Sequence, residues 1–89
     1  MNIRLAKKFA KQYSKAPQKI KKAFNNRLEI FKEQPFHPLL NNHSLIGKYL
    51  YHRSINVTGD WRAIYSEKLE KDGKVAIFFA LGTHSRLYK

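Results

Sequence analysis

Apolar residues at helical spacing open the sequence. They recur every four positions, at Leu5, Phe9 and Tyr13, while lysines fill many of the positions between them. This spacing places the three apolar side chains on one side of a helix. The segment Ser14–Pro17 predicts the turn that ends this helix, because proline is tolerated in the first turn of the next one. We therefore predict a first helix with one apolar stripe and cationic other faces.

A second apolar stripe follows the proline. Its members are three or four positions apart: Ile20, Phe24, Leu28 and Phe31. The stripe predicts a second helix that runs to about Glu33 and stops before Pro35. Two consecutive helices joined by a short turn predict an antiparallel helical hairpin whose apolar stripes pack on the rest of the domain.

The connector 34–42 holds two prolines and two asparagines. Beyond it, apolar residues recur at every second position instead of every third or fourth. Three segments have the composition and patterning of strands: 49–57, 61–66 and 75–81. The Asp-Gly pair at 72–73 predicts a tight turn, so the last two strands should be antiparallel neighbours. The sequence thus predicts one α+β domain over residues 1–89, with an amino-terminal helical hairpin packed on a small antiparallel sheet of three to four strands.

Charge narrows the class of partner. The chain carries 18 Lys and Arg against 6 Asp and Glu, a formal net charge of +12, and ten of the cations lie in residues 1–35. A surface this basic repels itself, and a polyanion relieves the repulsion, since each neutralised phosphate releases counterions. Nucleic acid is therefore the first candidate partner, and an anionic membrane surface is the second.

Several classes of protein are excluded by what the residues lack. There is no cysteine, no His pair with a Glu between, and no glycine-rich phosphate loop, so we expect neither disulfides nor a metal or cofactor. The first residues are broken by lysines, unlike a signal peptide, and no apolar run approaches the roughly 20 residues of a membrane span. We expect a cytoplasmic protein.

The groups left to carry chemistry lie near the predicted strand ends: His43, Asn56, Asp60, Arg62, His84 and Tyr88. Metal-free RNA cleavage needs a base for the 2′-hydroxyl proton, an acid for the leaving 5′-oxygen and a cation for the phosphorus. Histidine suits the first two tasks because it titrates near neutral pH, and arginine suits the third. Composition alone leaves open whether these groups converge.

Three stretches carry a resemblance to a known family. They are His43-Ser44-Leu45-Ile46-Gly47, then Gly59-Asp60-Trp61-Arg62-Ala63-Ile64-Tyr65, then Leu81-Gly82-Thr83-His84-Ser85-Arg86-Leu87-Tyr88. In order and spacing they resemble the H-x-L-x-G, D-W-R-x-I-Y and G-T-H-x-x-L-[YF] signatures of RelE/YafQ-type toxins of type II toxin–antitoxin systems. With the preceding basic helices, the resemblance covers nearly the whole chain.

The resemblance implies an endoribonuclease that enters the ribosomal A site, cuts mRNA there without metal, and is neutralised by a cognate acidic antitoxin. It also implies a chain that is monomeric when free and hetero-oligomeric with its antitoxin. His43 and His84 match family histidines of acid-base catalysis, Asp60 matches a catalytic acidic residue, and Tyr88 matches the terminal aromatic. Trp61 matches a position where the aromatic is kept.

Two departures from the family pattern remove catalytic candidates. Asn56 stands where YafQ-like members have another histidine, and Ala80 stands where they have an arginine. Asn56 can hydrogen-bond but cannot exchange a proton at neutral pH. The residues predicted to contact RNA or its phosphates are Arg53, Arg62, Arg86, Trp61 and Asn56, and any of the three arginines could supply the missing cation.

Alternatives stay open at this point. His84 could be a surface or capping residue, Trp61 a core residue, and Asp60 a residue that only shapes its turn. Tyr88 fits base stacking and proton transfer equally well. The chain as a whole could be a family member that kept RNA or antitoxin binding but lost efficient cleavage, or a basic DNA-binding module. Codon preference, antitoxin identity and complex stoichiometry are not encoded in these patterns.

Overall fold

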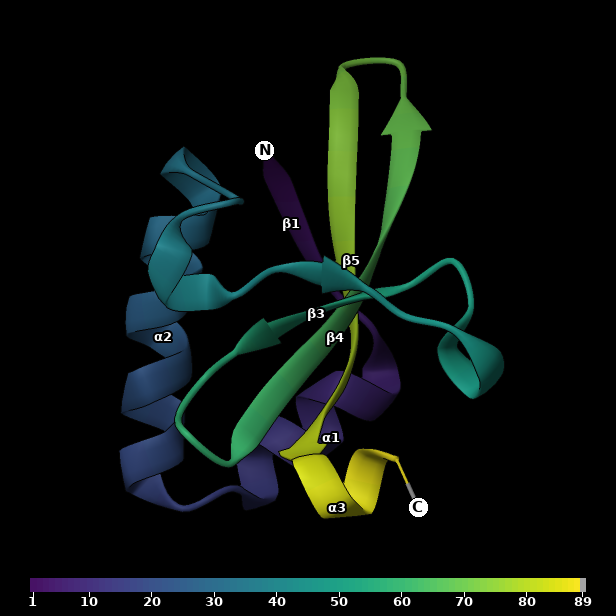
Figure 1. The fold of residues 1–89 in the computed structure, drawn as a ribbon. Helices are drawn as coiled ribbons and strands as arrows, with labels where there is room; N and C mark the ends of the chain where they lie inside the picture. The colour runs from purple at the N-terminus through teal and green to yellow at the C-terminus, as the bar shows by residue number, and fades with distance from the viewer. Residues whose placement is uncertain (89) are drawn as a thin grey trace.

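One mixed five-stranded sheet, in the order β1-β5-β4-β3-β2, organises the fold (Figure 1). The computed structural model describes residues 1–88. In chain order its elements are β1 (Asn2–Leu5), α1 (Lys7–Lys15), α2 (Gln18–Glu33), the 3-10 turn η1 (Pro38–Leu40), β2 (His43–Ser44), the 3-10 turn η2 (Gly47–Tyr49), β3 (Arg53–Asn56), β4 (Trp61–Glu70), β5 (Gly73–Thr83) and α3 (His84–Leu87). The α+β class is as predicted.

Helices α1 and α2 cover one face of this sheet, as their stripes predicted. Phe9 of α1 and Phe24 of α2 are buried, with ring centroids 5.0 Å apart, and both contact Phe78 of β5 at 5.7 and 5.6 Å. Phe31 adds an edge contact with Tyr65 of β4 at 4.9 Å. Fully buried aromatic side chains contribute about 1.5–3 kcal/mol each, so this cluster is the main apolar core.

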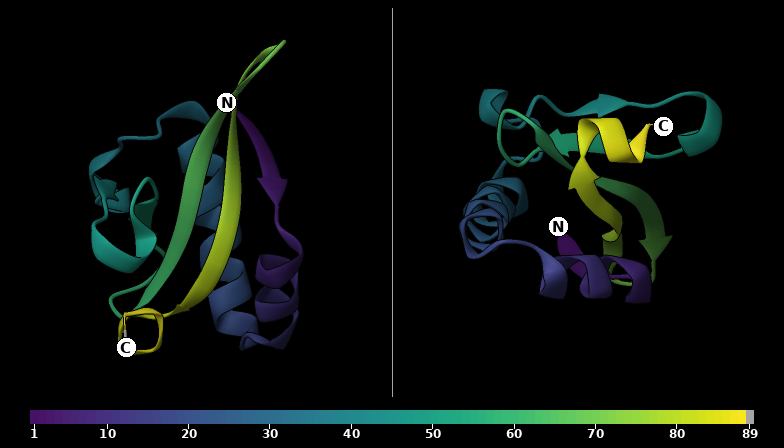
Figure 2. Two further views of the ribbon diagram at one scale, coloured as in Figure 1. Left: turned by 90° about the vertical axis from the view of Figure 1, so that its right-hand side faces the viewer. Right: turned by 90° about the horizontal axis from the view of Figure 1, so that it is seen from below.

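The two helices meet differently from the prediction. Helix α2 ends at Glu33, as expected, whereas the turn before it is only Ala16–Pro17, because α1 continues through Ser14 and Lys15 of the predicted turn. Figure 2 (right) shows α2 end-on and α1 from its side, however, so the helices cross instead of forming an antiparallel hairpin. The crossing lets α1 lie against the end of β5 while α2 runs along the sheet.

The sequence prediction is wrong at the amino-terminal end of the first helix, because residues 2–5 form a strand. Strand β1 pairs in parallel with β5, in the register Asn2↔Val75 to Leu5↔Phe78. Leu5, assigned to the helical stripe, is 43% exposed. The long β5 would otherwise leave its edge unpaired, and this long-range pairing outweighs the local helical pattern. The helix begins only at Lys7.

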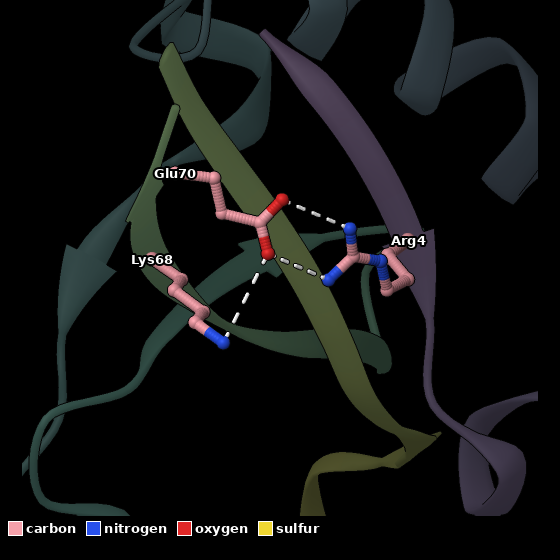
Figure 3. Close-up of polar contacts among 3 residues, drawn as sticks. All are labelled: Arg4, Lys68 and Glu70. Atoms are coloured by element: carbon pink, nitrogen blue, oxygen red, sulfur yellow. Dashed lines mark hydrogen bonds and ion pairs between the residues drawn. The ribbon is translucent and has the colours of Figure 1, made fainter. Parts of the chain in front are cut away.

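A bidentate ion pair fastens β1 further. Both guanidinium amino groups of Arg4 donate to the Glu70 carboxylate at 3.0 and 3.1 Å, across the front of β5, and the Lys68 amino group lies 3.9 Å from the same carboxylate (Figure 3). Hydrogen bonding to Arg4 lowers the pKa of Glu70 below its ordinary value. The contact joins the first strand to the end of β4.

The strand prediction over 49–57 is wrong in its first half. Gly47, at φ 65°, and Tyr51, at φ 72°, turn the chain twice, with Leu50 N donating to Gly47 O and His52 N to Tyr49 O. Strand β3 starts only at Arg53. The predicted hairpin between the last two strands is confirmed, with Gly73 at φ 116° in its turn. Together with β1 and the short β2, this makes five strands instead of three or four, and a mixed sheet.

The second sheet face is covered in part by the segment that these turns produce. Tyr49 is buried against Ile64, Ala80 and Leu87, with Phe79 at the edge of the cluster. The rest of this face is bordered by the β3–β4 turn and by α3, which follows β5 directly. No helix within residues 1–88 has the length and apolar character needed to cross a membrane.

Candidate active site

Three predicted site residues meet where β5 ends. The backbone N–H of His84 donates to the Asp60 carbonyl at 2.8 Å, so the first residue of α3 is fixed to the β3–β4 turn. His84 and Tyr88 are one helical turn apart, and their ring centroids lie 4.7 Å from each other. The Thr83 side chain caps α3 by accepting from Arg86 N at 3.3 Å. His84 and Asp60 are exposed, and Tyr88 is 37% exposed.

The turn that carries Asp60 is rigid. The Thr58 hydroxyl accepts from the backbone N–H of Asp60 and of Trp61, at 3.3 and 3.1 Å. One amino group of Arg62, Nη1, donates to the carbonyls of Thr58, Gly59 and Trp61, at 3.0, 3.2 and 3.1 Å. The Asp60 carboxylate thus projects from a turn that is held on both sides. Arg62 adjoins this site, but its Nη1 group is already hydrogen-bonded to the backbone of the turn.

His43 lies on β2, the edge strand of the sheet that is farthest from β1 and β5. In the register of the sheet, His43 of β2 pairs with Ser54 of β3. Ser54 pairs with Ile64 of β4, and Ile64 pairs with Ala80 of β5. Two strands therefore lie between β2 and β5, a separation of roughly 14 Å at about 4.8 Å per strand. The His43 Nδ1 lies 2.8 Å from the Asn41 carbonyl. Within residues 1–88, no described hydrogen bond or ring contact joins His43 to Asp60, His84 or Tyr88.

Two departures from the family pattern have distinct surroundings. Asn56 is opposite Arg62 on the partly covered face, and its buried Oδ1 has no hydrogen-bond partner among the described residues. Ala80 is fully buried, in the same apolar cluster as Tyr49, Ile64 and Leu87. Tyr49 also makes an edge contact with Tyr88, with centroids 5.7 Å apart. Tyr49, which the sequence reasoning did not single out, thus packs in the cluster that holds Ala80 and also contacts Tyr88.

The remaining predicted RNA contacts separate into two groups. Arg53 Nε donates to Asn42 at 2.7 Å, and its guanidinium lies 5.2 Å from the centre of the Phe36 ring, so it is committed to the connector after α2. Trp61 is half-buried against the main core. Arg86 is exposed on α3. Of these three, Trp61 and Arg86 border a cleft.

That cleft, of about 420 Å³, lies between α1, η2 and α3. Four cations line it: Lys8, Lys15, Lys48 and Arg86. Its other lining residues are Gln12, Ala16, Tyr49, Trp61, Leu81, Gly82 and Leu87. The sequence reasoning missed the three lysines, although Lys8, Gln12 and Lys15 stand at i, i+4 and i+7, which places them on one side of α1. Among residues 1–88, no group of three or more His, Asp or Glu could hold a metal ion.

Solved structures share this arrangement of elements. The YoeB/ParE toxin from Agrobacterium tumefaciens superposes with a TM-score of 0.75 at 16% identity, over 94% of this chain and 99% of that one. The RelE of the Pyrococcus horikoshii OT3 RelE–RelB complex gives 0.73 at 22% identity, over 96% of each chain. The E. coli DinJ–YafQ complex gives 0.64 at 26% identity, over 99% and 98%. No curated protein sequence matches significantly.

The fold is therefore that of the RelE-like toxins. The sequence of residues 1–89 also matches the family described as bacterial toxin of type II toxin–antitoxin system, YafQ. This chain belongs to the YafQ family of type II toxin–antitoxin toxins.

Proposed function

We propose that this chain is an mRNA interferase, a cytoplasmic endoribonuclease that cuts mRNA in the ribosomal A site and is silenced by a cognate acidic antitoxin. The observation that carries the proposal is the meeting of Asp60, His84 and Tyr88 at one end of the sheet, through a 2.8 Å backbone hydrogen bond and a 4.7 Å ring contact. Membership of the YafQ family supports it.

The proposed reaction needs only protein groups. A base removes the proton of a 2′-hydroxyl, the O2′–P bond forms, the P–O5′ bond breaks, and an acid protonates the leaving O5′. His84 takes one of these proton transfers, and Tyr88, beside it, takes the other or stacks on the neighbouring base. Asp60 accepts a hydrogen bond or a proton at the same site. The Arg62 guanidinium, which borders the turn of Asp60, stabilises the charge on the phosphorane.

His43 has a separate place in the proposal. It shares the proton transfers with His84 only if the RNA strand bridges the sheet from β2 to α3, because two strands lie between them. A His43→Ala variant tests this role. A loss of rate as large as that of His84→Ala would assign it to the reaction, and a loss confined to binding would assign it to the RNA path.

Cleavage of mRNA in a translation reaction, with chelator present, tests the activity. His84→Ala should lower the cleavage rate about a hundred- to ten-thousand-fold, the usual contribution of one acid-base group, and should relieve growth arrest in cells. Lys71→Ala, at the exposed tip of the β4–β5 hairpin, is the control and should leave both unchanged. Unaltered cleavage by His84→Ala would contradict the assignment.

Two features of the surface support an acidic antitoxin as the partner: the net positive charge and a group of exposed apolar residues. The +12 chain needs a neutralising partner, and the solved complexes of E. coli YafQ with DinJ and of P. horikoshii RelE with RelB support an antitoxin. Ile46, Leu50 and Tyr51, exposed at 87%, 50% and 87%, offer apolar surface for it to bury. Co-expression with the acidic protein of a neighbouring reading frame should give one complex at physiological salt. Recovery of two separate proteins would count against the pairing.

A second candidate function is a toxin that binds its antitoxin and RNA but cleaves weakly. The observation in its favour is the complete burial of Ala80 in the cluster with Tyr49, Ile64 and Leu87, where a cation would be unfavourable. It predicts a wild-type chain that binds antitoxin yet neither cuts mRNA nor slows growth. The same translation assay separates the two functions.

A further inference from the structure

We infer that the cationic cleft between α1, η2 and α3 binds the phosphates of a single-stranded RNA segment adjoining the cleaved nucleotide. The inference rests on the proposed function for its ligand, and it adds Lys8, Lys15 and Lys48 to the residues that act on RNA. None of these was among the predicted site residues.

The cleft is built by fixed elements. Gln12 of α1 accepts from the Leu81 backbone N–H at 2.8 Å, beyond the point where β1 stops pairing with β5. Buried Phe9 anchors the same helix in the core. The face of α1 that holds Lys8 and Lys15 is thereby set against the end of β5. The cations are thus held at their positions in advance, which lowers the entropic cost of binding.

Within residues 1–88, none of the four cations takes part in a salt bridge. The described salt bridges use other cations, namely Arg4, Lys32, Lys68 and Lys74. None of the residues that line the cleft is acidic. The amino groups of Lys8 and Lys48 lie over the rings of Phe79 and Tyr49, at 4.7 and 5.3 Å from the centroids, which restrains them without neutralising them. Four positive charges around one concave surface attract a polyanion.

The cleft adjoins the candidate active site across α3. Residues at i and i+2 of a helix point to different sides, so Arg86, which lines the cleft, points away from the side of α3 on which His84 and Tyr88 contact each other. Tyr49 links the two sides, since it lines the cleft and contacts Tyr88. An RNA strand that passes over this single helical turn would place one phosphate at His84 and neighbouring phosphates in the cleft.

The lining favours RNA over an acidic peptide. Its apolar members are already buried, with Ala16, Leu81 and Leu87 exposed by only 8%, 3% and 5%. An amphipathic helix would gain little by docking there, because it binds by burying apolar surface. The exposed apolar residues Ile46, Leu50 and Tyr51 offer that surface elsewhere. A narrow polar cleft with charged walls suits a phosphate chain.

The fluorescence of Trp61 can report binding in the cleft, because Trp61 is the only tryptophan in the sequence and lines the cleft. A short single-stranded 2′-O-methyl oligoribonucleotide, which cannot be cleaved, should change its fluorescence. Lys15→Ala and Arg86→Ala should each weaken binding roughly tenfold and reduce the slope of log K against log salt by about 0.7. Lys71→Ala is the matched control, because Lys71 lies in the β4–β5 turn, and Figure 1 shows this turn at the end of the molecule opposite α3. Thermal unfolding of each variant verifies that it is folded.

The outcomes separate this inference from the proposed function. If the fluorescence response depends on Lys15 and Arg86 while wild type cleaves nothing, the cleft assignment stands and the nuclease proposal fails. If wild type cleaves mRNA while Lys15→Ala and Arg86→Ala bind like Lys71→Ala, the cleft assignment is wrong. Tighter binding of duplex RNA, or of a polyglutamate peptide, with the same dependence on Lys15 and Arg86 would also overturn it.

Discussion

At the scale of single residues, position 80 shows how one departure from the family pattern is coupled to packing. Ala80 is fully buried in a cluster with Tyr49, Ile64 and Leu87, so an arginine at this position would have to displace these side chains. Overpacking of a buried position usually costs about 1–3 kcal/mol, and burying an unpaired charge costs more. The loss of the arginine and the presence of Tyr49 therefore belong together.

Ala80→Arg should accordingly lower the free energy of unfolding by at least about 1–3 kcal/mol, measured by denaturant unfolding. The same substitution at Ala10, an exposed position on α1, is the control and should cost little. Combining Ala80→Arg with Tyr49→Ala should recover part of the lost stability. A stable single Ala80→Arg variant would show that the ring of Tyr49 moves aside easily.

The sequence motifs identified those site residues that belong to a recognisable local segment, such as a turn or a short helix. The spacing of His84 and Tyr88 and the position of Asp60 in a turn could be predicted from the motifs, and the structure brings the three together. Lys8, Lys48 and Tyr49 could not be predicted as site residues, because their meeting depends on where α1 and η2 dock. Their local sequence resembles any solvated basic segment.

At the scale of elements, β1 shows that long-range pairing can override a local pattern. Leu5, which fits a helical stripe, lies instead in a four-residue strand, because β5 offered an unpaired edge. The double turn at Gly47–His52 replaced half of a predicted strand for a similar reason, since it lets Tyr49 cover the second sheet face. The end of helix α2 and the position of the β4–β5 turn, whose signals are local, were predicted correctly, although β4 extends four residues beyond its predicted end and β5 two residues beyond each of its predicted ends.

The attachment of β1 should be sensitive to acid. Arg4 lowers the pKa of Glu70, so this contact stabilises the fold above the ordinary carboxyl value of 4.5 and is lost as the pH falls below it. The melting temperature of wild type should exceed that of Glu70→Gln at neutral pH, and the two should converge in acid. Because the ion pair is solvent-exposed, high salt should reduce the difference. A constant difference between pH 7 and 3 would contradict this account.

At the scale of the whole molecule, the net charge of +12 makes salt act in opposite directions on folding and binding. Salt screens the self-repulsion of the free chain, so its melting temperature should rise with ionic strength. The same screening should weaken association with RNA and with an acidic antitoxin. Thermal unfolding and binding titrations over one salt series measure both effects. A free chain that salt destabilises would show that its surface cations are already neutralised.

The pairing of the first strand with the last also determines when the molecule can be assembled. During synthesis β1 emerges early and has no partner until β5 follows it, and α3 comes directly after β5. Contacts between distant parts of a chain slow folding, because a long loop must close first. The segment with His84 and Tyr88 is thus completed last. A nascent chain therefore cannot form the contact of His84 with the turn of Asp60 until most of residues 1–88 have been synthesised.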